Sequence, residues 1–219
     1  MNQAQWTAVD QYLEDALVPQ DAALQAALQA STAAGLPDIQ VMPNQGKLLA
    51  ILAQSIGARS ILELGTLGGY STIWLARALP ADGKLVTLEL DPKHAEVARG
   101  NIEQAGLAHM VEIQVGKALD LLPALTQHAP FDFIFIDADK DNSAAYFDWA
   151  IKLSRPGSLI IVDNVIRSGG VIDANHPDSR VQGIRRFFAA ATNDPRVTIT
   201  ALQTVGSKGY DGLALALVK

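Results

Sequence analysis

From residue 60 onward, short apolar runs alternate with longer stretches of helical periodicity. Runs of strand length occupy 60–64, 84–90, 110–115, 131–136 and 158–163. Helical patterns fill 70–79, 92–105, 117–127 and 142–153 between them. Strands that are apolar on both faces are typical of a parallel sheet with helices on both sides. The alternation therefore predicts an α/β fold built on such a sheet.

The two ends of the chain follow a different pattern. Before residue 57 the sequence predicts helices at 3–17, 21–34 and 45–56, the second of them ended by Gly35 and Pro37. After residue 180 it predicts a helix at 181–192 and strands at 196–203 and 212–218, which we expect to pair as a hairpin at one edge of the sheet. We expect one domain over 1–219, with a helical extension at 1–46 and the core sheet at 57–219.

Composition narrows the class of protein. The 219 residues are 49% hydrophobic, which is enough for one sizeable core. A net charge of −6 argues against a nucleic-acid binder, which needs a basic face. The absence of cysteine excludes disulfides and thiolate metal sites. The sequence has no apolar run of membrane-spanning length and no signal-peptide pattern, so we expect a cytoplasmic protein without membrane contact.

The candidate chemistry lies where the predicted strands end. Ligands bind beyond the carboxyl ends of the strands in an open α/β sheet. The first strand runs into a glycine-rich segment, 65–71 (GTLGGYS), which allows a tight turn and a close backbone approach to a ligand. Taken singly, a glycine turn is common and an acidic residue often only caps a helix. Together these loops open on one edge of the sheet, which indicates a binding site. The carboxylates at the strand ends are Glu63, Glu89, Asp137 and Asp163.

The glycine-rich segment and Glu89 suit a nucleotide cofactor. Glu89 ends the second strand, where an acid can hydrogen-bond a ribose diol. Both a nicotinamide cofactor and S-adenosylmethionine carry such a diol. The dinucleotide fingerprint Gly-x-Gly-x-x-Gly needs a second glycine, and Leu67 stands in its place after Gly65 and Thr66. This departure disfavours a nicotinamide-dependent oxidoreductase, which remains the alternative.

Hard oxygen ligands end two of the strands. Asp137, Asp163 and Asn164 suit Mg²⁺ first, with Ca²⁺ or Mn²⁺ as alternatives. Lys140 follows Asp137 closely and is a candidate general base, since a neighbouring divalent cation disfavours the charged form of a lysine. The alternative for Lys140 is a surface cation that balances the aspartates around it.

The motif set resembles that of the cation-dependent class I O-methyltransferases, the family of catechol and caffeoyl-CoA O-methyltransferases. The resemblance runs from about Val41 to the end of the chain, with the motifs in the same order at similar spacing. It implies a Rossmann-like, seven-stranded sheet that is parallel except for its last strand. It also implies metal-assisted transfer of a methyl group from S-adenosylmethionine to a small catechol-like or phenolic hydroxyl acceptor. The motifs are Ile61-Leu62-Glu63-Leu64-Gly65, Gly69-Tyr70-Ser71, Leu88-Glu89, Phe135-Ile136-Asp137 with Lys140, Asp163-Asn164-Val165 and Asp211-Gly212-Leu213.

The resemblance also implies a role for each matching residue. The methionine part of the cofactor would meet the backbone of Val41, and its carboxylate would meet Ser71. The ribose would meet Glu89, and the adenine the backbone N–H of Ala118. The remaining cofactor pocket would be formed by Glu63, Gly65, Thr66, Gly69, Tyr70, Asp137 and Asp139. The metal would be held by Asp137, Asp163 and Asn164, with Lys140 as the catalytic base.

Two departures bear on the acceptor. The stretch 203–210 contains no acid of the kind that orients the substrate in catechol O-methyltransferase, so a catechol would be held differently. No Lys or Arg precedes Lys47, which disfavours a CoA thioester. Family analogy implies a homodimer with the N-terminal helices near the interface or the substrate mouth. A non-catalytic binding homologue is a further alternative, which the intact Asp137, Lys140, Asp163 and Asn164 disfavour.

The histidines show no metal-ligand spacing. We expect His94, His109 and His128 at the surface. His176 lies in the polar segment 169–182, directly after the candidate metal loop. Long loops in compact domains are often functional, so this segment is either a lid over the substrate or a long surface loop.

Overall fold

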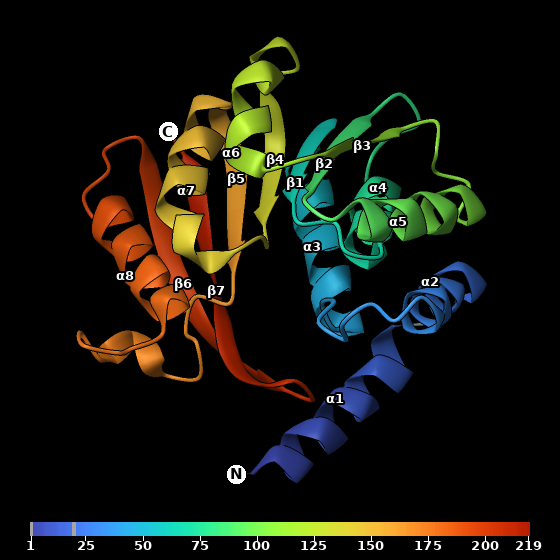
Figure 1. Ribbon diagram of the computed structural model, residues 1–219, viewed down its shortest axis with the longest axis horizontal. Coiled ribbons are helices and arrows are strands. Elements are labelled where there is room, and N and C mark those ends of the chain that lie inside the picture. Colours follow the sequence, from blue (N-terminus) through green and yellow to red (C-terminus); the bar gives the residue numbers. More distant parts are fainter. Residues whose placement is uncertain (1, 19–20) are drawn as a thin grey trace.

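A single seven-stranded sheet organises the computed structural model, which describes residues 2–18 and 21–219 (Figure 1). The strand order is β3-β2-β1-β4-β5-β7-β6, and β7 runs antiparallel to both of its neighbours. This confirms the predicted sheet, its antiparallel last strand and the hairpin at one edge. The strands are β1 (Ser60–Leu64), β2 (Lys84–Glu89), β3 (Val111–Val115), β4 (Phe131–Ile136), β5 (Ser154–Asp163), β6 (Val197–Gly206) and β7 (Gly209–Val218). Residues 1, 19 and 20 of the expected N-terminal extension lie outside the described part.

Helices cover both faces of the sheet. One apolar cluster joins the sheet to helices α2 to α5, and the other joins it to α6 to α8. Figure 1 shows these two sets on opposite sides of the strands. The helices are α1 (Gln3–Leu17), α2 (Ala22–Ala33), α3 (Pro43–Ser55), α4 (Tyr70–Arg77), α5 (Pro92–Gln104), α6 (Ala118–Leu121), α7 (Ser143–Lys152) and α8 (Ser179–Ala191). Among the described residues, no helix combines the length and the apolar character needed to cross a membrane.

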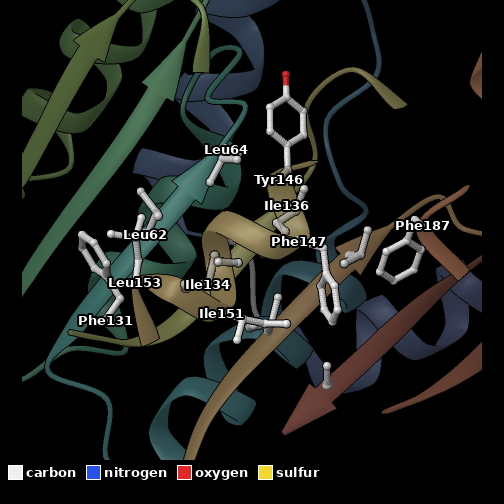
Figure 2. Packing of buried hydrophobic residues seen from close by; sticks show 14 of the residues in the cluster. Leu62, Leu64, Phe131, Ile134, Ile136, Tyr146, Phe147, Ile151, Leu153 and Phe187 are labelled. Atoms are coloured by element: carbon white, nitrogen blue, oxygen red, sulfur yellow. The ribbon is translucent and has the colours of Figure 1, made fainter. Parts of the chain in front are cut away.

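The apolar strands divide their side chains between the two clusters. In β4, Ile134 and Ile136 face α6 to α8, whereas Phe133 and Phe135 face α2 to α5. On the α6-to-α8 side, Phe147 of α7 meets Phe187 of α8 edge to face, with ring centroids 5.0 Å apart (Figure 2). The fully apolar character of the strands thus reflects burial on both faces.

Several predicted boundaries were wrong. The helix expected at 117–127 is split into α6 and a 3₁₀ segment, Leu122–Gln127, where Pro123 removes a backbone donor. The hairpin strands are longer than predicted and pair as far as Gly206 with Gly209. Their outer part carries exposed polar side chains such as Gln203 and Thr204, so it lacks the apolar pattern that marks a strand.

Helix α1 lies outside the sheet and contacts the hairpin. None of its residues is buried. Gln3 Nε2 donates to the carbonyl oxygens of Gly206 and Ser207, at 2.9 and 3.0 Å. The backbone N–H of Ser207 donates to Asp10 Oδ2 at 2.7 Å. These hydrogen bonds therefore hold α1 against the turn between β6 and β7.

Candidate active site

A cavity of about 900 Å³ opens at the carboxyl ends of β1, β2 and β4. This is the edge of the sheet where an open α/β fold binds its ligands. Most of the residues that the sequence singled out line it. They are Val41, Gly65, Thr66, Tyr70, Ser71, Glu89, Ala118, Asp137, Asp139, Lys140 and Asn164.

The glycine-rich segment has the backbone that its sequence predicts. Gly65 has a φ of 97°, and a Cβ there would collide with the carbonyl of Asp137. Gly69 is the N-cap of α4, with a φ of 81°. No side chain from the described residues caps α4, so the N–H groups of its first turn are available to an anionic group. Gly69 itself is not among the lining residues, since a Cβ there would face Ala98, and its contact with a cofactor stays a prediction.

Glu89 holds the glycine-rich segment against the end of β2. Its Oε2 accepts the backbone N–H groups of Thr66 and Leu67, at 3.1 and 2.8 Å. Its Oε1 accepts the N–H of Asp91 at 2.9 Å. His94 Nδ1 lies 3.6 Å from Oε1, and its partly exposed side chain lines the cavity. His109 and His128 are exposed, as expected.

Glu63 is fully buried and is not among the lining residues of the cavity, so its place in the cofactor pocket stays a prediction. Its carboxylate accepts the hydroxyls of Ser71, Thr72 and Thr87, at 2.6, 2.5 and 2.8 Å. Complete burial raises the pKa of Glu63 to about 7, although the three hydroxyl donors lower it. The Ser71 hydroxyl is therefore oriented from below by a buried acid.

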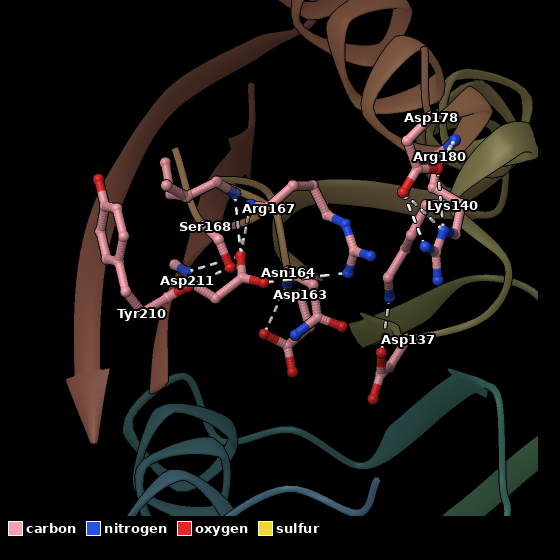
Figure 3. A network of polar contacts seen from close by, with 12 residues as sticks. Asp137, Lys140, Asp163, Asn164, Arg167, Ser168, Asp178, Arg180, Tyr210 and Asp211 are labelled. Carbon is pink, nitrogen blue, oxygen red and sulfur yellow. Dashed lines mark hydrogen bonds and ion pairs between the residues drawn. The ribbon is translucent and has the colours of Figure 1, made fainter. Parts of the chain in front are cut away.

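Asp137, Lys140, Asp163 and Asn164 converge at the ends of β4 and β5 (Figure 3). Lys140 Nζ donates to Asp137 Oδ1 at 2.7 Å. Lys140 is only 7% exposed, so it does not lie at the surface, although it does pair with one of the aspartates around it. Burial, followed by the charge of Asp137, raises the pKa of Asp163 to about 7. Gln45 of α3, which the sequence did not single out, donates to Asp163 Oδ2 at 2.6 Å.

A second cavity of about 360 Å³ lies on the other side of this cluster. Asp137 and Asn164 line both cavities, whereas Asp163 lines only the second. The cluster thus stands at the boundary between two adjoining spaces. Across the described residues, no three His, Cys, Asp or Glu side chains form a metal cluster. The donor set here is two carboxylates and one amide, all of them hard oxygen ligands.

Known proteins share this architecture over the whole chain. The O-methyltransferase family profile matches residues 16–218. The catechol O-methyltransferase of Niastella koreensis is 56% identical and covers 100% of both chains. The chain belongs to the O-methyltransferase family. Among solved structures, the O-methyltransferase from Bacillus cereus in complex with SAH is 59% identical, with a TM-score of 0.98 and 100% of both chains covered. The O-methyltransferase TomG from Streptomyces achromogenes, involved in tomaymycin synthesis and solved with SAM, is 53% identical with a TM-score of 0.97, covering 100% of this chain and 99% of its own.

Tyr146 is a site residue of this O-methyltransferase that sequence reasoning missed. It belongs to α7, and its hydroxyl donates to Asp139 at the rim of the cavity. Burial, with Asp139 as the next cause, raises the pKa of Tyr146. Asp139 also accepts the side-chain amide of Asn142 at 2.8 Å. The apolar pattern of α7 identifies Tyr146 only as a core residue, and no sequence signal shows that its hydroxyl reaches the cavity.

The segment 169–182 of the methyltransferase comprises a 3₁₀ turn, Gly170–Ile172, a loop and the first turn of α8. Gln182 Nε2 donates to the carbonyls of Ala174 and His176, at 3.1 and 2.9 Å. His176 Nδ1 accepts the N–H of Asp178 at 3.2 Å. Within this segment only Arg180 lines a described cavity, and Arg167 lines the same cavity just before it. A lid role for the segment stays a prediction.

Proposed function

We propose that the chain transfers a methyl group from S-adenosylmethionine to a hydroxyl of a small catechol-like or phenolic acceptor, assisted by a divalent cation. The observation that carries the proposal is the cluster of Asp137, Lys140, Asp163 and Asn164 between two adjoining cavities. The larger cavity suits a nucleoside cofactor, and the cluster suits an acceptor hydroxyl. The two similar structures described with SAH or SAM support the choice of cofactor.

The cofactor contacts follow from the larger cavity. The carboxylate would meet the free N–H groups at the start of α4, beside Tyr70 and Ser71. The ribose would meet Glu89, with the adenine beside Ala118 and the amino group near Asp139. The methionine part would pass between Val41 and the Gly65-Thr66 backbone.

The metal site we propose comprises Asp137, Asp163 and Asn164. Two carboxylates and an amide oxygen match the ligand preference of Mg²⁺, with Ca²⁺ or Mn²⁺ as alternatives. The burial of Asp163 beside Asp137 supports a cation here, because two adjacent carboxylates in a buried site repel each other. When bound, such a cation supplies positive charge that favours ionisation of an acceptor hydroxyl.

Lys140 is the base in this proposal. It lines the larger cavity and contacts Asp137, so a hydroxyl that reaches this cluster comes close to its amine. With a cation at Asp137 in place of this ion pair, Lys140 in its neutral form would take the hydroxyl proton, and the resulting oxyanion would attack the methyl group of the donor. The O–C bond forms as the C–S bond breaks, which leaves S-adenosylhomocysteine. Holding both reactants side by side at this cluster supplies most of the rate by orientation.

Calorimetry with S-adenosylhomocysteine and with NAD tests the choice of cofactor. We expect S-adenosylhomocysteine to bind and NAD not to bind. In Glu89→Ala we expect the affinity to fall by about 1–3 kcal/mol, because a hydrogen bond to a charged group is lost. Glu96→Ala, at an exposed position on α5, is the matched control. An unchanged dissociation constant for Glu89→Ala would show that Glu89 only secures the glycine-rich segment, and binding of NAD alone would support the oxidoreductase alternative.

We also propose a homodimer that covers the apolar side chains around α1. Val9 and Tyr12 of α1 are 50% and 72% exposed, and Leu202 of β6 is 57% exposed. Light scattering at micromolar concentration should give twice the chain mass of 23.3 kDa. Tyr12→Glu should shift the measured mass toward that of the monomer. Ile172→Glu, at an 88% exposed position in the segment 169–182, should leave the mass unchanged. A monomeric mass for the unaltered chain would refute the dimer.

A further inference from the structure

Arg167 has a guanidinium whose donors are largely unused. Its Nε is buried and has no hydrogen-bond partner among the described residues. Its one ion-pair contact there, from Nη1 to Asp211 Oδ2, is 4.0 Å long and therefore exceeds hydrogen-bonding distance. Buried polar groups normally have partners, because an unmet donor costs free energy. An anion that reached this guanidinium would supply the missing acceptors.

The loop that carries Arg167 has an unusual backbone. Arg167 and Ser168 have φ values of 54° and 53°, in the left-handed region that residues other than glycine rarely adopt. Asp211 holds this conformation, since its Oδ1 accepts the N–H groups of Ile166 and Arg167, both at 3.0 Å. Strained backbone of this kind is concentrated at ligand-binding sites. The loop therefore presents Arg167 in a fixed position.

The side chain of Arg167 points toward Lys140, the base in the proposed function. Figure 3 shows its side chain extending from the loop past Asn164 toward Lys140. Arg180 lies beside Lys140 in the same view, and both arginines line the larger cavity. Asp178 orients Arg180, with Nε–Oδ1 at 3.0 Å and Nη2–Oδ2 at 2.7 Å. Two guanidinium groups thus border the larger cavity, one just before the 169–182 segment and one within it.

A planar anion fits this arrangement. Guanidinium groups bind carboxylates through paired, charge-assisted hydrogen bonds. Asp211 does not satisfy Arg167, because its Oδ1 accepts backbone N–H groups and its Oδ2 lies 4.0 Å from Nη1. Arg180 is exposed and already paired, which makes it the weaker of the two contacts. Arg167 would therefore provide most of the recognition.

We propose that Arg167, aided by Arg180, binds a carboxylate on the acceptor, so that the preferred acceptors are hydroxylated aromatic acids. This inference rests on the proposed function, because it places the ring hydroxyls of the acceptor at Lys140 and Asn164. The arginines then select the acceptor without taking part in the transfer itself.

The test compares 3,4-dihydroxybenzoate with its methyl ester, which keeps the ring hydroxyls and removes the charge. The unaltered enzyme, assayed with S-adenosylmethionine and Mg²⁺, should favour the acid in kcat/KM by at least about tenfold, as expected for a charge-assisted hydrogen bond. Arg167→Gln should abolish this preference through a higher KM for the acid and leave the ester unaffected. Arg167→Lys should restore part of it, and Arg180→Gln should reduce it less. Arg99→Gln, at an exposed position on α5, is the matched control and should keep the wild-type preference.

Each other outcome contradicts a defined part of this account. Turnover of the ester as efficient as turnover of the acid would overturn the arginine inference and leave the proposed function intact. An equal loss on both compounds in Arg167→Gln would assign Arg167 a structural role and also overturn the inference. Absence of turnover with both compounds would contradict the proposed function together with the inference that rests on it.

Discussion

Replacing Lys140 with alanine should lower kcat by about 10²–10⁴, the usual contribution of general acid–base catalysis. The affinity for S-adenosylhomocysteine should stay close to that of the unaltered enzyme, because Lys140 contacts Asp137 at the acceptor side of the site. Stopped-time assays with a labelled methyl donor give the first quantity, and calorimetry gives the second. Because a bound cation also favours ionisation of the acceptor, the loss should be larger for a weakly acidic phenol than for a strongly acidic one.

Lys93→Ala, at an exposed position on α5, is the matched control and should behave as the unaltered enzyme. Full turnover by Lys140→Ala on both kinds of acceptor at neutral pH would assign Lys140 a purely structural role beside Asp137. The cation and solvent would then account for all of the deprotonation.

Removal of divalent cations should cause the second large loss of turnover. Polarisation by a metal ion is worth several kcal/mol, so a chelator should lower turnover by at least about 10². Added Mg²⁺ should restore turnover. Adding Mn²⁺ in its place shows whether the site accepts a second kind of divalent cation. Cation binding measured by calorimetry should be lost in Asp163→Ala.

The matched control for the metal site is Asp82→Ala, whose carboxylate lies in an exposed ion pair with Arg59. It should retain both cation binding and activity. Undiminished turnover in excess chelator, with no metal retained by the protein, would contradict the metal role of Asp137, Asp163 and Asn164.

The fold was predictable because the strands that form the sheet are apolar on both faces. Such runs are visible in the sequence, and their alternation with helices determines a parallel sheet. The same logic located Asp137, Asp163 and Asn164, because residues directly after strands must gather at one edge. The outer part of the β6–β7 hairpin was not predictable, since its exposed polar residues carry no apolar period.

Two Leu-Glu-Leu sequences, at 62–64 and 88–90, contain glutamates whose different burial the sequence does not predict. Glu63 and Glu89 have the same neighbours, yet Glu63 is sealed beneath the cavity and Glu89 lines it. The register of the sheet makes the difference, because Glu63 pairs with Thr87 and Glu89 lies two residues further toward the open edge. Register is a tertiary property that a single strand does not encode.

The other missed residues come from elements distant in the sequence. Gln45 reaches Asp163 from α3, and Tyr146 reaches Asp139 from α7. Arg167 takes its position from Asp211, which is far along the chain at the start of β7. Each contact depends on how whole helices and strands pack together, so no local sequence pattern predicts it.

The most direct test of the central claim is a methyl-transfer assay with isotope-labelled S-adenosylmethionine, Mg²⁺ and a vicinal-diol phenol, read by mass spectrometry. The account predicts one labelled methyl group on a ring hydroxyl and one equivalent of S-adenosylhomocysteine, with both products suppressed by chelator. Absence of methylated product and of S-adenosylhomocysteine across a panel of such phenols, from protein that binds the cofactor, would contradict it.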